Sequence, residues 1–257
     1  MRGKKIKILL YAVAAIVLLP VVFWYAAVPD SAIPGLIASR AGGPGYDVRV
    51  NNFHKGLLLS FSAASVTVGC GGRPALAFEG VRGRINPLGL LGLRLLVPFK
   101  AVLAGGTVRG RYAYGLFSGR SRVRAKVEGA QLSGLPLIKG SRGTLRARLE
   151  YAGGPGGMAG SLMFSAKDLR DFPYGFRNAN GVVYLTPGGL KIKSISLDSG
   201  EMYAKLKGGI HNGQYNIRME VTTPGPGETC RNPLLAPYRV SPGYYVIPLS
   251  GRFRQLP

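Results

Sequence analysis

Few side chains in this sequence could do chemistry. The chain has two histidines, His54 and His211, and two cysteines, Cys70 and Cys230. Acid–base catalysis, nucleophilic catalysis and metal binding all need such residues close to one another or to carboxylates. The histidines lie far apart in the sequence, and neither stands in a His-Glu-x-x-His motif. We therefore predict no catalytic residue, no cofactor site and no metal site.

Carboxylates are also scarce, with 11 Asp plus Glu in the chain. Asp168 and Asp171 flank Arg170, which favours a solvated turn with local ion pairs over an acid–base pair. The glycine clusters at 42–45 and 153–157 contain proline and flank strand patterns, so they favour turns over phosphate-binding loops. An enzyme is the least favoured class, and a pocket that joins a histidine to two acids would revive it.

The N-terminus predicts how the chain is placed at a membrane. Residues 8–29 form an uncharged, apolar stretch of 22 residues, and about 20 suffice to cross a bilayer as a helix. The basic residues before it are Arg2, Lys4, Lys5 and Lys7. By the positive-inside rule they hold the tail in the cytoplasm. We predict a basic cytoplasmic tail at 1–7, a transmembrane helix at 8–29 and an exported, periplasmic β-rich domain at 30–257.

Two aromatic residues, Trp24 and Tyr25, lie near the far end of this stretch, where we predict a membrane-anchoring belt. The alternative is a cleaved signal peptide, whose apolar core has about 7 to 15 residues. The longer stretch favours a retained anchor. On the exported side, oxidising conditions allow a disulfide between Cys70 and Cys230, and two free thiols are an equal alternative.

Most of the exported part shows the period-two alternation of strands. In 120–127 every second residue is Arg or Lys, and in 144–151 Thr144, Arg146, Arg148 and Glu150 alternate with apolar residues. This predicts a mainly β fold: a long, curved antiparallel β-sheet, as a curled sheet or a sandwich, with one or two short helices. The expected strands are 57–68, 75–84, 107–114, 120–127, 144–151, 160–166, 181–185, 190–197, 202–210, 214–221 and 244–254. The alternation breaks near Ser194, which predicts a bulge there.

Two short segments predict helix. Residues 31–38 form a helical turn, and Asn86 with Pro87 predicts the start of a leucine-rich helix that ends at Pro98. This second helix would either lie in a lipid interface or cover the open end of the sheet. The proline-rich segment 223–243 predicts a loop or an edge-covering segment, because proline cannot donate to a strand ladder.

The positive charge is concentrated in the middle of the chain. The formal net charge is +23, and residues 82–148 hold 14 Lys plus Arg against the single acid Glu128. The candidate face for an anionic partner comprises Arg109, Arg111, Arg120, Arg122, Arg124, Lys126, Arg146 and Arg148. It would attract anionic lipid, lipopolysaccharide or an acidic protein. We predict no nucleic-acid partner, because the domain is exported. A merely solvated outer face is the alternative.

Several stretches together resemble the type II secretion system protein N family (GspN). They include Gly56-Leu-Leu-Leu-Ser-Phe-Ser, Gly105-Gly-Thr-Val-Arg-Gly-Arg-Tyr and Pro248-Leu-Ser-Gly-Arg-Phe, after the basic tail and the apolar span. The resemblance implies a non-enzymatic, single-pass inner-membrane protein. Its periplasmic β-domain would link inner-membrane and outer-membrane parts of the secretion machine and contact other secretion-system subunits.

The same layout also resembles the broader AsmA-like group of anchored periplasmic β-proteins, which implies an alternative function. In that case a curled sheet would bind or conduct lipid in an apolar groove. The residues expected to line it are Val123, Val127, Leu145, Leu149, Tyr112 and Tyr114. A tightly filled interior would argue against the groove, and an open, continuous apolar surface would weaken a purely scaffolding role.

Overall fold

The computed structural model describes residues 22, 24, 29–41, 46–138, 140–155, 157–170, 175–223 and 236–252. The chain divides into two compact units, residues 1–103 with 108–122 and residues 104–107 with 123–257. The tail at 1–7 and nearly all of the predicted transmembrane helix at 8–29 lie outside the described residues. Within the described part, no helix has the length and apolarity needed to cross a membrane.

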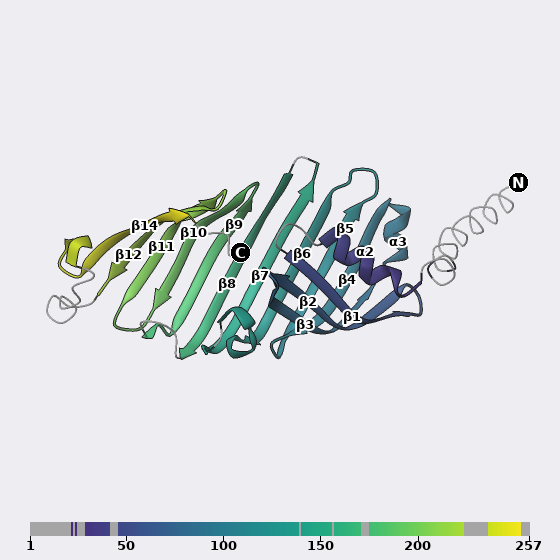
Figure 1. Ribbon diagram of the computed structural model, residues 1–257, viewed down its shortest axis with the longest axis horizontal. Helices are drawn as coiled ribbons and strands as arrows, with labels where there is room; N and C mark the ends of the chain where they lie inside the picture. The colour runs from purple at the N-terminus through teal and green to yellow at the C-terminus, as the bar shows by residue number, and fades with distance from the viewer. Residues whose placement is uncertain are drawn as a thin grey trace, which may run out of the picture. The chain divides into compact units, whose positions relative to one another are not determined.

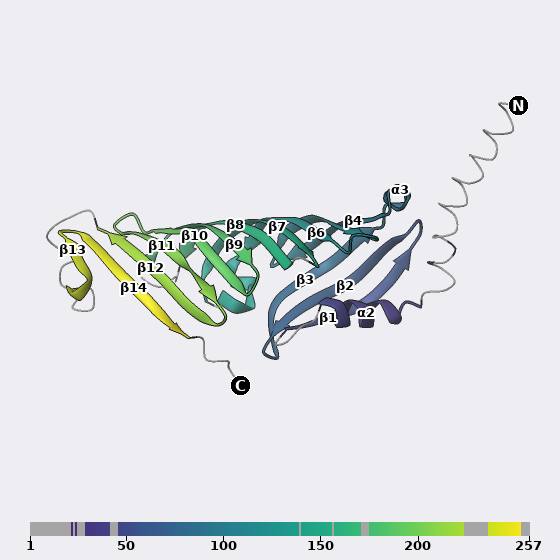
Figure 2. The same cartoon turned by 90° about the horizontal axis from the view of Figure 1, so that it is seen from above.

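The first unit is an antiparallel sheet with two helices (Figures 1 and 2). Its strands β1 to β5 are hydrogen-bonded in sequence order, and α2 packs on β1. Its elements are α2 (Ala32–Ala41), β1 (Tyr46–Gly56), β2 (Ser60–Cys70), β3 (Arg73–Arg84), α3 (Pro87–Leu91), β4 (Arg94–Leu103) and β5 (Gly106–Gly115). The predicted helical turn at 31–38 corresponds to α2. The strands β1 and β4 were not expected from the sequence.

The predicted helix from Asn86 to Pro98 is wrong in its length. Its start is confirmed, because Asn86 Oδ1 accepts a hydrogen bond from the backbone N–H of Leu88 at 3.0 Å. The helix α3 ends at Leu91, since Gly92 and Leu93 turn the chain and Leu93 takes a positive φ of 54°. Residues from Arg94 onward form β4 and pair with β3. Ladder hydrogen bonds therefore override the apolar helix-like composition.

The second unit is a longer antiparallel sheet (Figure 1). Its strand order follows the sequence from β6 to β12, and β14 lies between β12 and the edge strand β13. Its elements are β6 (Ser121–Gln131), η1 (Leu132–Gly134), η2 (Pro136–Ile138), β7 (Arg142–Gly154), β8 (Gly157–Arg170), β9 (Asn178–Thr186), β10 (Gly189–Asp198), β11 (Tyr203–His211), β12 (Gln214–Thr222), η5 (Ala236–Tyr238), β13 (Arg239–Ser241) and β14 (Tyr244–Arg252). In both units the predicted mainly β, curved antiparallel architecture is confirmed.

Two details of the second unit match the sequence pattern. The register of β10 against β9 shifts between Ile192 and Ser194, which confirms the predicted bulge. The proline-rich segment 223–243 contains a 3-10 turn at 236–238 and the short edge strand β13, while 224–235 lie outside the described residues.

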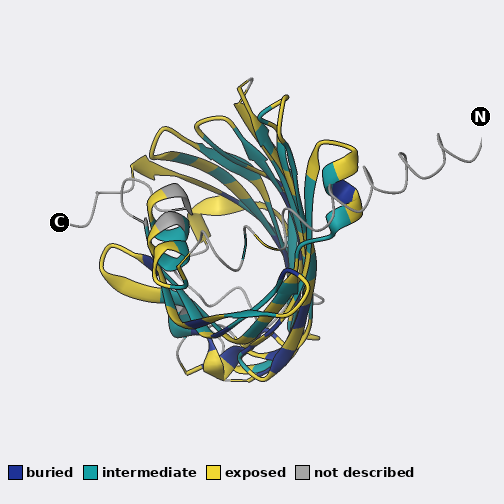
Figure 3. Cartoon of the chain, turned by 90° about the vertical axis from the view of Figure 1, so that its right-hand side faces the viewer, coloured by how far each residue is buried: buried dark blue, intermediate teal, exposed yellow. Residues whose placement is uncertain are grey.

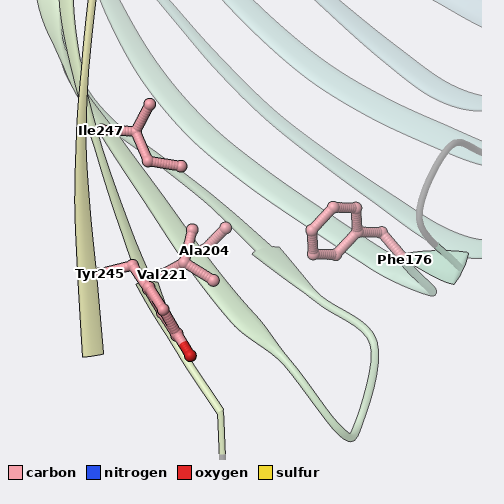
Figure 4. Close-up of a cluster of buried hydrophobic side chains, with 5 residues drawn as sticks. All are labelled: Phe176, Ala204, Val221, Tyr245 and Ile247. Atoms are coloured by element: carbon pink, nitrogen blue, oxygen red, sulfur yellow. The ribbon is translucent and has the colours of Figure 1, made fainter. Parts of the chain in front are cut away.

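Strand register gives the second unit one polar and one apolar face. Cα partners on neighbouring strands point to the same face, and successive residues alternate between faces. Exposed and less exposed bands accordingly alternate along the strands in Figure 3. Figure 4 shows the core cluster on the apolar face, where Phe176, from the segment before β9, joins side chains of three strands. Those side chains are Ala204, Val221, Tyr245 and Ile247.

Candidate functional site: the polar and apolar faces of the sheet

Four of the predicted basic residues lie on the polar face of the second unit. Arg124 and Lys126 come from β6, Arg146 and Arg148 come from β7, and all four are exposed. Half-buried Val123, Ala125 and Val127 alternate with them along β6. The prediction of which face of these strands is exposed to solvent is therefore confirmed.

Two carboxylates lie among these four cations. Glu150 Oε1 is 3.0 Å from Arg148 Nη2 and 4.0 Å from Arg124 Nε. Lys126 Nζ and Glu128 Oε1 are 2.6 Å apart. These cationic side chains are 61–66% exposed, so each pair is screened by solvent and contributes about 0–1 kcal/mol. Within the described residues Arg146 has no ion-pair partner, and the group keeps an excess of positive charge.

The other four predicted basic residues belong to the first unit. Arg109 and Arg111 lie on β5, Arg120 lies in the turn after it, and Arg122 follows at the start of β6. All four are exposed. No carboxylate of the described residues forms an ion pair with them. Each unit thus carries half of the predicted basic face.

A second basic region on the polar face was not expected from the sequence. It is an open groove of about 990 Å³ across β10, β11, β12 and β14. Its charged border consists of Lys191, Lys207, Arg218 and Arg252, all exposed, and His211 lies beside them. Register brings these residues together, because Lys207 is the Cα partner of Arg218 and His211 is the partner of Gln214. The residues come from four different strands, so no local spacing in the sequence identifies the groove.

Neighbouring polar groups orient two of the groove arginines. Arg218 Nε is 3.3 Å from Glu220 Oε1. With the amide of Gln214 turned so that its oxygen faces Arg252, that oxygen accepts hydrogen bonds from Arg252 Nη2 at 3.0 Å and Nε at 3.1 Å. The part of the groove lining that the structure describes contains no carboxylate. Such a groove attracts anions and offers no acid–base pair.

The apolar face of the second unit is made of rows that cross the strands. One row is buried or half-buried from β7 to β14: Leu145, Ala166, Ala179, Leu197, Ala204, Val221 and Tyr245. A row nearer the other strand ends contains Leu149, Leu162, Val183, Ile192, Gly208, Ile217 and Leu249. In that row only Val183 and Ile192 are buried, and Leu249 is exposed.

The residues predicted to line a lipid groove are all half-buried. Val123, Val127, Leu145 and Leu149 belong to the second unit, whereas Tyr112 and Tyr114 belong to the first. Partial exposure of leucine and valine on successive strands means that their apolar surface is not fully removed from water. Within the second unit the apolar face therefore remains partly accessible to water at these positions.

The remaining reactive residues are the two histidines and the two cysteines. His54 is exposed on β1 in the first unit, and His211 is exposed at the end of β11 in the second. Among the described residues, no group of three or more His, Cys, Asp or Glu is arranged to hold a metal ion. Cys70 is exposed at the end of β2, and Cys230 lies outside the described residues, so their disulfide stays a prediction.

Most of the predicted membrane residues also fall outside the described part. This holds for Arg2, Lys4, Lys5, Lys7 and Tyr25. Trp24 is described: its backbone carbonyl oxygen accepts a hydrogen bond from Lys55 Nζ at 2.9 Å.

Comparisons with known protein families, with curated proteins and with solved structures find no match to this chain. The family resemblance therefore rests on the sequence pattern.

Proposed function

We propose that this chain is a non-enzymatic, single-pass inner-membrane component of a type II secretion system. Its β-rich part would lie in the periplasm and connect inner-membrane and outer-membrane parts of the machine by binding acidic partner surfaces. The proposal draws its identity from the resemblance in sequence. The observation that carries it is the exposure of all eight predicted cations, half of them on each unit.

Exposure of these cations favours partner binding because charged residues on a sheet face steer association with an oppositely charged surface. Among the described residues, only Glu128 and Glu150 lie within ion-pair distance of the four cations on β6 and β7. An acidic partner would therefore meet net positive charge. The groove across β10 to β14 extends the basic surface along the same sheet of the second unit.

Charge reversal in the producing bacterium tests this proposal. The double variant Arg124→Glu/Arg146→Glu removes two cations of the polar face, and Arg177→Glu, an exposed arginine just before β9, is the matched control. We expect export of a folded secreted protein to fall about tenfold in the double variant, which corresponds to about 1.4 kcal/mol of binding. Immunoblotting would establish equal amounts of each variant.

A photocrosslinking residue at position 146 supplies the direct readout. Capture of a secretion-system subunit supports the proposal. Recovery of phospholipid without any secretion protein, or normal secretion in a strain that lacks the chain, would overturn it.

The second candidate function is lipid binding on the apolar face of the second unit. The partial exposure of Leu149, Leu162 and Ile217 favours it, because a purely structural sheet would bury such side chains under a second layer. Acyl chains would gain free energy by covering this row. This observation also weighs against a role that uses only the charged face.

Two adjacent residues of β7 provide a matched test of lipid binding. Leu149 points to the apolar face and Arg148 to the polar face. A photocrosslinker at Leu149 of the full chain in its native membrane should capture phospholipid, and one at Arg148 should capture much less. Equal lipid capture at both positions would reject a specific apolar site.

A further inference from the structure

The first unit exposes a cluster of large apolar side chains in its turns. They come from the β1–β2 turn, from α3 and the residues after it, and from the β5–β6 turn. The apolar tip, as we define it, consists of Leu57, Leu58, Leu88, Leu91, Leu93, Leu116 and Phe117. Phe117 is 83% exposed and Leu57 79%. Exposed apolar residues scattered singly are normal on a protein surface, but a contiguous group marks an interaction site.

These three turns lie at one end of the first unit's sheet. In an antiparallel meander the connections after β1, β3 and β5 fall on the same side. Backbone hydrogen bonds join them directly: Ile85 N–H donates to Leu59 C=O at 3.0 Å, and Leu116 N–H donates to Leu93 C=O at 3.0 Å. The apolar tip is therefore one surface assembled from three connections.

Two of the exposed leucines occupy backbone conformations that leucine disfavours. Leu58 has φ of 54° and Leu93 also has φ of 54°. Turns with positive φ normally take glycine or asparagine, which adopt this region at little cost. Neither side chain gains burial in return, since Leu58 is 59% and Leu93 49% exposed. Residues held in such a conformation concentrate at functional sites.

The charges around the apolar tip suit an anionic surface. Arg84, Arg94 and Arg120 are exposed within or beside the three turns, and the segments 56–60, 84–96 and 115–120 contain no acidic residue. Apolar side chains flanked by basic ones are the pattern of segments that enter the interface of an anionic bilayer.

The apolar tip also lies close to the end of the predicted transmembrane helix. Lys55, two residues before Leu57, donates a hydrogen bond from Nζ to Trp24 C=O at 2.9 Å. Its Nζ is also 3.4 Å from Asp30 Oδ1, and the Lys55 side chain is only 10% exposed. The chain at Trp24 and Asp30 is thus held against the end of β1 at which the apolar tip begins.

We propose that the apolar tip docks into the surface of an anionic lipid bilayer, with Phe117 and the exposed leucines in the interface and the three arginines at the phosphate groups. The inference rests on the proposed placement of the chain at a membrane and not on its role in secretion. Docking holds the first unit on the bilayer from which the chain emerges, with the end of the sheet that carries the three turns facing the lipid.

Tryptophan fluorescence of the full chain tests the docking. Trp24 is the only tryptophan, so Trp24→Phe combined with Phe117→Trp gives a single reporter at the apolar tip. The matched control is Trp24→Phe with Val102→Trp, because Val102 is an apolar residue, 39% exposed, at the opposite end of β4 from Leu93. Each variant is reconstituted into vesicles of brominated phosphatidylcholine and phosphatidylglycerol.

We expect bromolipid to reduce the emission at position 117 by about twofold, because an interfacial side chain reaches the upper acyl region, while position 102 stays unquenched. A reporter at Leu88→Trp should behave like position 117. If the chain enters the vesicles but positions 117 and 102 respond equally, docking is overturned and the membrane placement stands. If the chain does not enter the vesicles, both are overturned.

Discussion

The apolar face of the second unit differs from one end to the other. The row through Ala204, Val221 and Tyr245 is buried, and Phe176 packs against it. Leu149, Leu162 and Ile217, in the row nearer the other strand ends, have the same apolar character and are only half-buried. Composition is therefore similar, and what differs is whether another segment covers the row.

The difference separates stability from binding within one sheet. A covered row loses its contact with water and stabilises the fold, with about 25 cal/mol for each Å² of apolar surface removed. A half-buried row keeps part of that surface available for a ligand. Substitutions in the two rows should therefore have unequal effects on folding, and the following predictions test this from the largest effect to the smallest.

The largest effect is expected at Tyr245, which is 2% exposed in the buried row. Tyr245→Ala should lower the free energy of unfolding by about 3–5 kcal/mol, as truncation of a buried aromatic side chain does. Denaturant unfolding of the full chain, followed by circular dichroism, measures it. Tyr203→Ala is the control, because Tyr203 is 44% exposed on the polar face, and its loss should be below about 1 kcal/mol. Equal losses would contradict the assignment of the core.

A smaller effect is expected from added volume in the buried row. Ala204 is 1% exposed, so Ala204→Leu should destabilise the unit by about 1–3 kcal/mol through overpacking. The same change at half-buried Ala147 of β7, which is not part of the core cluster, should alter the unfolding free energy by about 0.5 kcal/mol or less. If Ala147→Leu is as harmful as Ala204→Leu, then a second layer covers the apolar face at Ala147.

The smallest effect is expected on the charged face. Glu150→Gln removes the partner of Arg148 and Arg124 but should change stability by about 0–1 kcal/mol, because these ion pairs are exposed. Its effect should appear instead in binding, since the change removes one negative charge from the polar face and raises its net positive charge. Retention on a heparin column should move to higher salt. Unchanged retention would show that the cations around Glu150 on the polar face do not bind anions together.

Much of the strand pattern was predictable from single residues. Arg122, Arg124 and Lys126 alternate with small apolar residues, and a one-residue slip of β6 would move all of them to the other face. The bulge after Ile192 was visible for the same reason, as a break in the alternation. By contrast β1 and β4 were missed, because polar residues interrupt the first and leucines fill the start of the second in a pattern that also suits a helix.

The groove and the apolar tip could not be predicted in this way. Lys191, Arg218 and Arg252 lie far apart in the sequence and meet only through the registers of β10, β11, β12 and β14. The three turns of the apolar tip likewise meet only because their strands are neighbours in one sheet.

The sequence by itself determined which side chains face water on most strands, where the chain turns, and where the positive charge lies. These properties depend on alternation and local backbone preference, which act over a few residues. Only the tertiary structure decided which apolar row is covered and which cations share a groove. Both depend on strand neighbours and on loops that pack over the sheet, and such contacts join residues whose spacing in the sequence carries no signal.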